Sequence, residues 1–193
     1  MHPGFYPKSQ NGYKFRMSSN ARMLVKSEAA KGDGQQDSGE PKQRERTYIM
    51  IKPDGVQRRV VGQIIDRFEK RGLKMVGMKL YKPPREMFEK HYEHLASKPF
   101  FNDLVDYASS GPICAMVWEG NDAIDACRQM LGATKPLDAT PGTIRADFGL
   151  DIGRNVIHGS DSLENANTEI NFWFKEDELV QWQDENEKWQ FEF

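Results

Sequence analysis

The 193-residue chain contains little cysteine, and its arrangement does not suit metal binding or a disulfide framework. The two cysteines, Cys114 and Cys127, lie in apolar stretches, and no CxxC or CxH spacing is present. A structural zinc site is therefore not expected, and a reducing compartment fits this cysteine usage best. The chain also lacks an apolar run that approaches the roughly 20 residues of a membrane span. It has no internal repeat, no Walker A loop and no GxGxxG motif.

Positive charge is scarce in the larger part of the chain. Residues 1–46 contain nine Lys/Arg and five Asp/Glu, whereas residues 47–193 contain 18 Lys/Arg and 24 Asp/Glu. The larger part is not basic overall, which argues against a surface that binds duplex DNA. An anionic ligand would have to be held by lysines and arginines gathered locally.

Residues 1–46 are rich in Gly, Ser, Gln, Asn and Lys and show no sustained hydrophobic period. This composition predicts a disordered N-terminal extension, followed by one domain over residues 47–193 with a C-terminal arm. The first 31 residues contain six basic residues and one acid, Glu28, as in an organelle transit peptide. Arginines are few, however, and the amphipathic pattern is poor. We therefore favour a cytoplasmic protein, with a mitochondrial transit segment as the alternative.

The domain alternates between strand and helix patterns. Strands are predicted over residues 48–51, 73–81, 113–118 and 155–158, because each is apolar and bounded by turn residues. Helices are predicted over residues 61–71, 87–95, 104–108, 122–131 and 163–174 from apolar residues at helical spacing. Residues 52–55 are predicted to form a turn, and residues 132–154 a long irregular loop of the kind that is often functional. The order predicts an α+β, ferredoxin-like βαββαβ fold.

The segment 155–161, Asn-Val-Ile-His-Gly-Ser-Asp, delivers one histidine from a strand into a turn. Gly159 is expected to relax the backbone, so that a bulky group can approach the ring of His158. Ser160, Asp161 and Ser162 are helix N-cap types, and the start of a helix favours anions. Imidazole is a good nucleophile near neutral pH. These residues alone leave open whether His158 meets a phosphate or only bonds to the turn.

A set of ordered motifs from Arg46 to Glu192 resembles the nucleoside diphosphate kinase family essentially end to end. The motifs are IKPDGV (51–56), HY (91–92), KPFF (98–101), SGP (110–112), MVWEG (116–120), PGTIRADF (141–148) and GRNVIHGSDS (153–162). The resemblance implies that a nucleoside triphosphate, mainly ATP, gives its γ-phosphoryl group to a histidine. The phosphohistidine then gives the group to a different nucleoside diphosphate, in a ping-pong exchange.

The resemblance assigns four catalytic positions. His158 matches the phosphorylated histidine, and Glu169 matches the carboxylate that holds its ring. Lys52 would be the cation over the transferring phosphoryl group, and Tyr92 would pack beside His158. No general base is needed for a neutral imidazole, so the demands are alignment and charge neutralisation.

The resemblance also assigns the residues that hold the nucleotide. Arg128 and Arg145 would clamp the phosphates, helped by the hydroxyl of Thr134, and Asn155 would bind the ribose hydroxyls. Magnesium would arrive on the nucleotide's phosphates, with few or no protein ligands. The implied base slot is apolar, which predicts broad base specificity. Its residues are Phe100, Leu104 and Ile152, the last in place of a valine that is common in the family.

Two further features follow from the family pattern. Glu192 matches a glutamate that often ends family members near a neighbour's base site, and Phe193 extends past it, so its role stays open. Family members assemble as hexamers or tetramers, and we expect a homohexamer. His91 and His94 lie three residues apart without a third metal ligand in sequence, so we interpret both as structural or surface residues.

A second hypothesis is a binding module that keeps the fold but docks a partner instead of catalysing a reaction. The filled catalytic positions argue against it. Exchange of a phosphoryl group between ATP and a different diphosphate would separate the two.

Overall fold

The computed structural model describes residues 44–190. Its centre is a four-stranded antiparallel sheet in the order β2-β3-β1-β4. The strands are β1 (Arg44–Ile51), β2 (Lys74–Tyr81), β3 (Ile113–Asn121) and β4 (Ile157–Gly159). The longest pairing joins β1 to β3, from Arg44 opposite Asn121 to Ile51 opposite Cys114. The ferredoxin-like fold expected from the sequence is confirmed.

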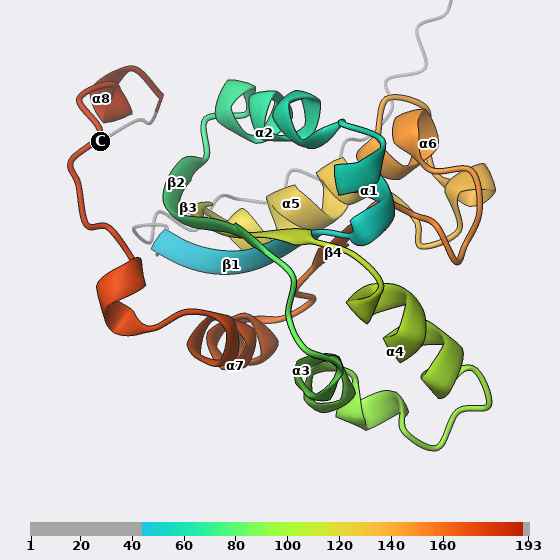
Figure 1. Cartoon of the computed structure of the whole chain (residues 1–193). Helices are drawn as coiled ribbons and strands as arrows, with labels where there is room; N and C mark the ends of the chain where they lie inside the picture. The colour runs from blue at the N-terminus through green and yellow to red at the C-terminus, as the bar shows by residue number, and fades with distance from the viewer. Residues whose placement is uncertain (1–43, 191–193) are drawn as a thin grey trace, which may run out of the picture. The chain divides into compact units, whose positions relative to one another are not determined.

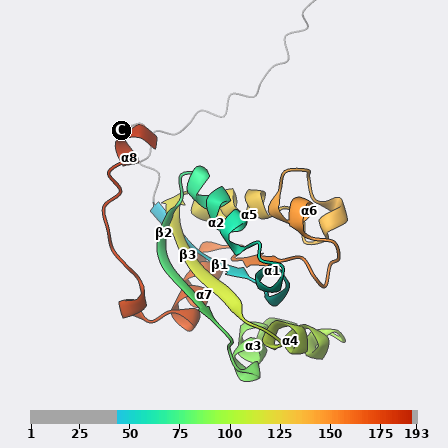
Figure 2. The same ribbon diagram turned by 45° about the horizontal axis from the view of Figure 1, so that its top comes forward.

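Helices cover both faces of the sheet (Figures 1 and 2). One face carries α1 (Pro53–Gln57), α2 (Val61–Lys70), α5 (Ala123–Leu131) and α6 (Ile144–Phe148). The other carries α3 (Arg85–His91), η1 (Glu93–Leu95), α4 (Phe101–Ser109) and α7 (Leu163–Trp173). The remaining short helices are η2 (Pro136–Asp138), η3 (Glu176–Glu178) and α8 (Glu187–Gln190).

The period-2 alternation of the central strands divides the core into two clusters. Ile49 and Ile51 of β1 pack with Phe68 of α2 and Leu131 of α5 on one face. On the other face, Tyr48 and Met50 join a cluster that includes Trp173 of α7. Residues 48–51 of β1 and 113–118 of β3 are fully or almost fully buried, so the centre of the sheet is packed on both faces.

Strand β4 is only three residues long and pairs with β1, so that His158 lies opposite Met50. Side chains directly opposite in a ladder share one face. His158 therefore lies on the face covered by α3, α4 and α7. The fold thus brings His158 beside α3, which begins some 70 residues earlier in the chain.

Three parts of the sequence are more ordered than expected. Residues 52–55 are not only a turn, because Pro53 begins the short helix α1; proline is well suited to the first helical position. The loop 132–154 contains η2 and α6, and the hydroxyl of Thr143 caps α6 by accepting a bond from the Ala146 amide. Strand β1 also begins at Arg44, ahead of the predicted domain start at Thr47.

After α7 the chain runs along β2. The Val180 amide donates to the Val76 carbonyl at 2.7 Å, and the indole of Trp182 donates to the Met75 carbonyl at 2.9 Å. The C-terminal arm therefore has defined contacts with the sheet through Trp182. Glu192 and Phe193 lie outside the described residues.

Candidate active site

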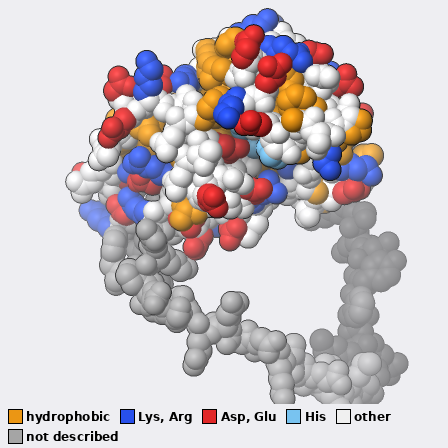
Figure 3. Space-filling view, turned by 90° about the horizontal axis from the view of Figure 1, so that it is seen from below, with side chains coloured by type: hydrophobic (Ala, Val, Ile, Leu, Met, Phe, Trp, Pro, Cys, Tyr) orange, Lys and Arg blue, Asp and Glu red, His pale blue; other side chains and the backbone are white. Residues whose placement is uncertain are grey.

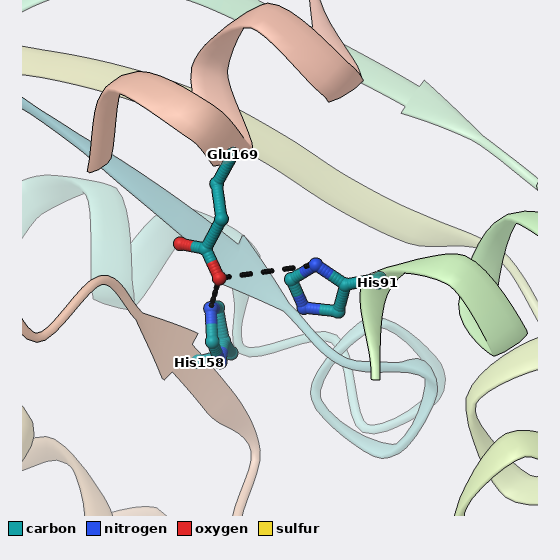
Figure 4. A group of neighbouring side chains, drawn as sticks. All are labelled: His91, His158 and Glu169. Atoms are coloured by element: carbon teal, nitrogen blue, oxygen red, sulfur yellow. Dashed lines mark hydrogen bonds and ion pairs between the residues drawn. The ribbon is translucent and has the colours of Figure 1, made fainter. Parts of the chain in front are cut away.

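His158 of β4 and Glu169 of α7 form the centre of the candidate site. Nε2 of His158 lies 2.8 Å from Oε1 of Glu169 (Figure 4). The Ser160 hydroxyl donates to the other carboxylate oxygen. A carboxylate accepts hydrogen bonds, so this contact fixes the tautomer that carries hydrogen on Nε2. Nδ1 is then the nitrogen with a free lone pair. The His158 side chain is 22% exposed, which leaves it open to a ligand.

Gly159 has a different role from the one expected. A Cβ atom there would lie 2.9 Å from Cδ1 of Ile49 and 3.0 Å from Cδ2 of Leu131. The missing side chain therefore permits close packing against the core, on the opposite face of the strand from His158. Its φ angle is not among the positive ones, so backbone freedom is not what this position requires.

His91, interpreted from the sequence as structural or surface, lies beside the catalytic candidates. Its side chain is 2% exposed, and its ring centroid is 4.9 Å from that of His158 (Figure 4). The indole of Trp173 donates to Nδ1 of His91 at 3.2 Å, and the same nitrogen is 3.8 Å from Oε1 of Glu169. Burial, followed by the nearby His158, lowers the pKa of His91 to about 2. His91 therefore stays uncharged, and Glu169 bonds to His158.

Within residues 44–190, His91, His158 and Glu169 are the group of side chains close enough to share a metal ion. Their arrangement is explained without one. Trp173 donates to Nδ1 of His91, and His158 donates to Glu169. A cation would have to displace both hydrogen bonds, so we interpret the group as a hydrogen-bonded network.

Lys52, at the N-cap of α1, meets the segment that precedes His158. Its ammonium group donates to Oδ1 of Asn155 at 2.7 Å, and the side-chain Nδ2 of Asn155 donates to the Thr134 carbonyl at 2.8 Å. Three residues that the family resemblance assigns to the site, Lys52, Asn155 and Thr134, are thus in one chain of contacts. Burial, and then the charge of Arg145, lowers the pKa of Lys52 to about 8, against the opposing effect of Asp54.

Arg145 is almost fully buried on α6, which is unusual for a charged residue. Its guanidinium donates to the carbonyls of Gly132 and Ile157 at 2.8 and 3.0 Å, while its Nε has no partner among residues 44–190. Burial, and then the charge of Arg128, lowers its pKa to about 10. Because Ile157 is adjacent to His158, Arg145 places positive charge next to the candidate nucleophile.

The other predicted residues differ in exposure. Tyr92 is buried, and its hydroxyl has no partner in the described part of the chain. Arg128 and Thr134 are exposed. Phe100 and Ile152 are 51% and 60% exposed, which suits apolar groups that await a planar ligand, and Leu104 packs partly against the core. Phe100 precedes α4 and Ile152 lies between α6 and β4, so the two sides of the expected base slot come from separate segments.

The face shown in Figure 3 carries acidic and basic side chains interspersed, with a histidine visible among them. It has no broad field of positive charge, in agreement with the charge balance of the sequence. Positive charge at the candidate site comes instead from individual residues, of which Lys52 and Arg145 are partly or almost wholly buried.

Comparison with known proteins decides the family. The model of the nucleoside diphosphate kinase family matches residues 45–179. The chain belongs to the nucleoside diphosphate kinase family. A nucleoside diphosphate kinase of Neurospora crassa is 60% identical over 149 residues, which cover 77% of this chain and 98% of that protein. The nucleoside diphosphate kinase of Saccharomyces cerevisiae is 55% identical over 78% of this chain and 98% of its own length.

Solved structures agree. A halophilic nucleoside diphosphate kinase from Halobacterium salinarum, in complex with CDP, has a TM-score of 0.76 and 49% identity. The match covers 78% of this chain and all of that one. A family protein from Babesia bovis gives a TM-score of 0.74 at 44% identity, over 76% of this chain and 99% of that one. The chain is therefore an enzyme, a phosphotransferase that acts on nucleotides, as expected from the sequence motifs.

Membership in the nucleoside diphosphate kinase family implies a kinase that binds nucleotides and depends on a divalent cation. Among residues 44–190, none of the helices is long and apolar enough to cross a membrane. His91 is the site residue that sequence reasoning missed. Its only local signal was the HY motif, and the partners that reveal its position, Glu169 and Trp173, lie some 80 residues away in the chain.

Proposed function

We propose that His158 carries the phosphoryl group between nucleoside triphosphate and nucleoside diphosphate. Nδ1 attacks the γ-phosphorus, the bond to the β,γ-bridging oxygen breaks, and the nucleoside diphosphate leaves. An oxygen of the acceptor's terminal phosphate then attacks the phosphorus, and the P–N bond breaks. Each half-reaction moves one phosphoryl group, so the enzyme returns to its starting form after two transfers.

The observation that carries this proposal is the bond between Nε2 of His158 and Oε1 of Glu169 at 2.8 Å. It holds the ring in one orientation and leaves Nδ1 unprotonated. It also stabilises the ring's positive charge that develops when Nδ1 forms a bond to phosphorus. Glu169 is in turn fixed by the Ser160 hydroxyl, so the carboxylate does not have to reorient during transfer.

The phosphates are held by cations from three separate elements. Lys52 precedes α1, Arg128 lies on α5 and Arg145 on α6. Guanidinium groups suit phosphate oxygens because their donors match the oxygens in pairs. The hydroxyl of Thr134 is assigned to the same oxygens, and Tyr92 to the packing beside the phosphorylated ring.

Magnesium belongs to the substrate in this scheme, because it arrives on the nucleotide's phosphates. The side chains assigned to the phosphates are cationic or neutral, and the nearby carboxylate of Asp54 already accepts bonds with both of its oxygens. The chain thus supplies little of the oxygen coordination that Mg²⁺ prefers. When bound, the ion neutralises part of the phosphate charge.

Phe100, Leu104 and Ile152 are assigned to the base, and Asn155 to the ribose. An apolar contact without hydrogen-bonding groups discriminates poorly among bases, so we propose broad base specificity. The bond from Lys52 to Asn155 would then link the residue that binds the sugar to the one that binds the phosphate.

Labelling with ATP in the absence of an acceptor tests the assignment of His158. One phosphoryl group should appear on the protein, stable in base and labile in acid, as expected of a phosphoramidate. The His158→Ala variant should lose the label and turnover, whereas His94→Ala, a change at an exposed position, should keep both. A label that survives acid, or that persists in His158→Ala, would refute the proposal.

We propose further that the protein is a homohexamer. The outer strand β2 supports self-association, because Met78 and Leu80, beyond the part that bonds to residues 180–182, are largely exposed. Light scattering coupled to gel filtration would measure the mass, and a monomer or tetramer would contradict the hexamer.

We propose a cytoplasmic location, and residues 1–46 fused to a fluorescent reporter should stay diffuse. Import into mitochondria would favour the alternative.

A further inference from the structure

The turn before His158 is held by a segment that lies about 100 residues earlier. The Lys52 amide donates to the Val156 carbonyl at 2.8 Å, and the Val156 amide donates to Oδ2 of Asp54 at 3.2 Å. Both backbone polar groups of Val156 are thus bound by residues 52–54. The Ile157 amide donates to the Asn155 carbonyl at 2.8 Å, which makes a tight turn centred on Val156.

Val156 adopts an unfavourable backbone conformation. Its φ is +61°, which is rare for a β-branched residue because of the clash of its side chain with the backbone. Such a conformation persists only where the surroundings over-determine it. Residues 52–55 provide that surrounding structure, since a Cβ at Gly55 would lie 2.6 Å from Cγ2 of Ile51 and 3.1 Å from the Val156 carbonyl oxygen. The close approach of the two segments requires glycine.

The second oxygen of Asp54 connects this turn to a different helix. The hydroxyl of Tyr107, near the end of α4, donates to Oδ1 of Asp54. Burial, and then the bond to Asp54, raises the pKa of Tyr107, so the hydroxyl keeps its proton. The guanidinium of Arg154 lies over the same ring, 3.9 Å from its centroid. Helix α4 therefore contacts the chain immediately before the turn as well as the carboxylate that holds it.

Helix α4 also begins at the expected base site. Phe100 is its N-cap and Leu104 lies in its second turn, whereas Asn155, assigned to the ribose, adjoins Val156. We propose that Asp54 and Tyr107 are positioning residues that fix the base-binding helix α4 to the turn leading to His158. This inference rests on the proposed function, because it assigns the Tyr107–Asp54 bond a role in aligning the base, sugar and phosphates of one bound nucleotide.

The hydrogen bond between Tyr107 and Asp54, here called the bridge, predicts different effects on two kinds of phosphoryl donor. A nucleotide uses α4 and the turn together, so loosening α4 should weaken its binding. Phosphoramidate has no base or sugar and needs only His158 and the cations around it. Losing the Tyr107 hydroxyl should therefore affect the first donor and spare the second.

Tyr107→Phe is the most direct variant, because it removes one hydroxyl and keeps the ring under Arg154. With ATP, the concentration that gives half-maximal labelling of His158 should rise about tenfold, the effect of losing one hydrogen bond to a charged group. The limiting labelling rate should change little, and the labelling rate with phosphoramidate should equal that of the wild type. Ser109→Ala is a matched control, since among residues 44–190 its hydroxyl bonds to carbonyls of α4, and it should leave every value unchanged.

Asp54→Asn should act more broadly, because it disturbs the acceptor of the Val156 amide as well as that of Tyr107. Labelling by both donors should slow. Adding Tyr107→Phe to Asp54→Asn should weaken ATP binding by less than tenfold, since the bond between the two is already altered. Circular dichroism and thermal unfolding would establish that each variant is folded.

Three outcomes would overturn the inference or its basis. An unchanged ATP dependence in folded Tyr107→Phe would refute the bridge. An equal loss with ATP and phosphoramidate in Tyr107→Phe would mean that Tyr107 supports the turn alone and not the placement of α4. Wild-type protein that no donor labels at His158 would refute the proposed function, and the positioning role with it.

Discussion

The indole N–H of Trp173 donates to Nδ1 of His91 at 3.2 Å, and this bond occupies the nitrogen that faces Glu169. Protonating that nitrogen would break the bond and place a positively charged imidazolium beside His158. Burial is the largest cause of the low pKa of His91, about 2, and it keeps the ring neutral over the whole physiological range. The carboxylate of Glu169 is thereby kept for His158, the proposed nucleophile.

His91 should make the fold sensitive to acid. Its pKa is lowered by burial from 6.5 to about 2, so between these values the unfolded chain binds a proton that the native chain does not. The free energy of unfolding should then fall as pH drops below 6.5, by up to about 1.4 kcal/mol per pH unit from this residue. His91→Asn should flatten this slope, and His94→Asn should not. Urea unfolding at several pH values measures it, and parallel slopes in wild type and His91→Asn would contradict it.

Lys52 should give the reaction an alkaline limit. Burial lowers its pKa to about 8, so the free enzyme loses this cation as pH rises through 8 and phosphate binding weakens. kcat/KM should therefore decline above about pH 8. Lys52→Arg should lower activity at pH 7 through altered geometry but move the decline to higher pH, because a guanidinium keeps its proton. Identical alkaline limbs in the two proteins would assign the limit to another group.

Phe100 should act on all bases alike. If the base stacks on this exposed ring, every base offers a similar face, and stacking on an aromatic contributes on the order of 1–3 kcal/mol where single-stranded nucleic-acid binders have been probed. Phe100→Ala should lower kcat/KM about tenfold for adenine, guanine, cytosine and uracil diphosphates, equivalent to ~1.4 kcal/mol. A loss confined to one base would indicate polar recognition and contradict broad specificity.

The N-terminal boundary can be tested with two truncations. Removing residues 1–43 leaves β1 whole, and turnover and oligomer size should stay nearly unchanged. Removing residues 1–46 also deletes the pairing of Arg44 to Arg46 with Asn121 to Glu119, and the bond from Arg46 to Glu119 at 2.8 Å. The longer deletion should lower the melting temperature, by about 2–4 °C for each kcal/mol lost in a domain of this size. Equal melting temperatures would show that the end of β1 adds no stability.

The sequence allowed the sheet and the long helices to be predicted because their signals are local. The continuous apolar runs of β1 and β3 and the apolar spacing of α2, α5 and α7 directly reflect which side chains are buried. The short helices α1 and α6 were missed for a physical reason. Five residues give too few turns for a periodic pattern, so their helices depend on Pro53 and on the Thr143 cap.

The family motifs predicted most of the residues that belong to the site, but not which of these residues contact one another. The bond between Lys52 and Asn155 joins residues 103 apart, and no local pattern specifies it. The position of His91 beside His158 was not predicted for the same reason, since it depends on contacts between α3 and α7. The bridge of Asp54 to Tyr107 was likewise invisible, because an Asp-Gly pair after a strand is ordinarily sufficient to explain a turn.

The position of His158 opposite Met50 bears on the direction of the reaction. If His158 carries the phosphoryl group as proposed, it must offer the same geometry to the donor and to the acceptor nucleotide. Its backbone is paired with the fully buried residues 49–51 of β1, so gaining or losing a charged group does not require the chain around it to be rebuilt. Forward and reverse transfers then use one arrangement of atoms. The relative abundance of triphosphates and diphosphates, rather than any preference of the protein, decides which way the phosphoryl group moves.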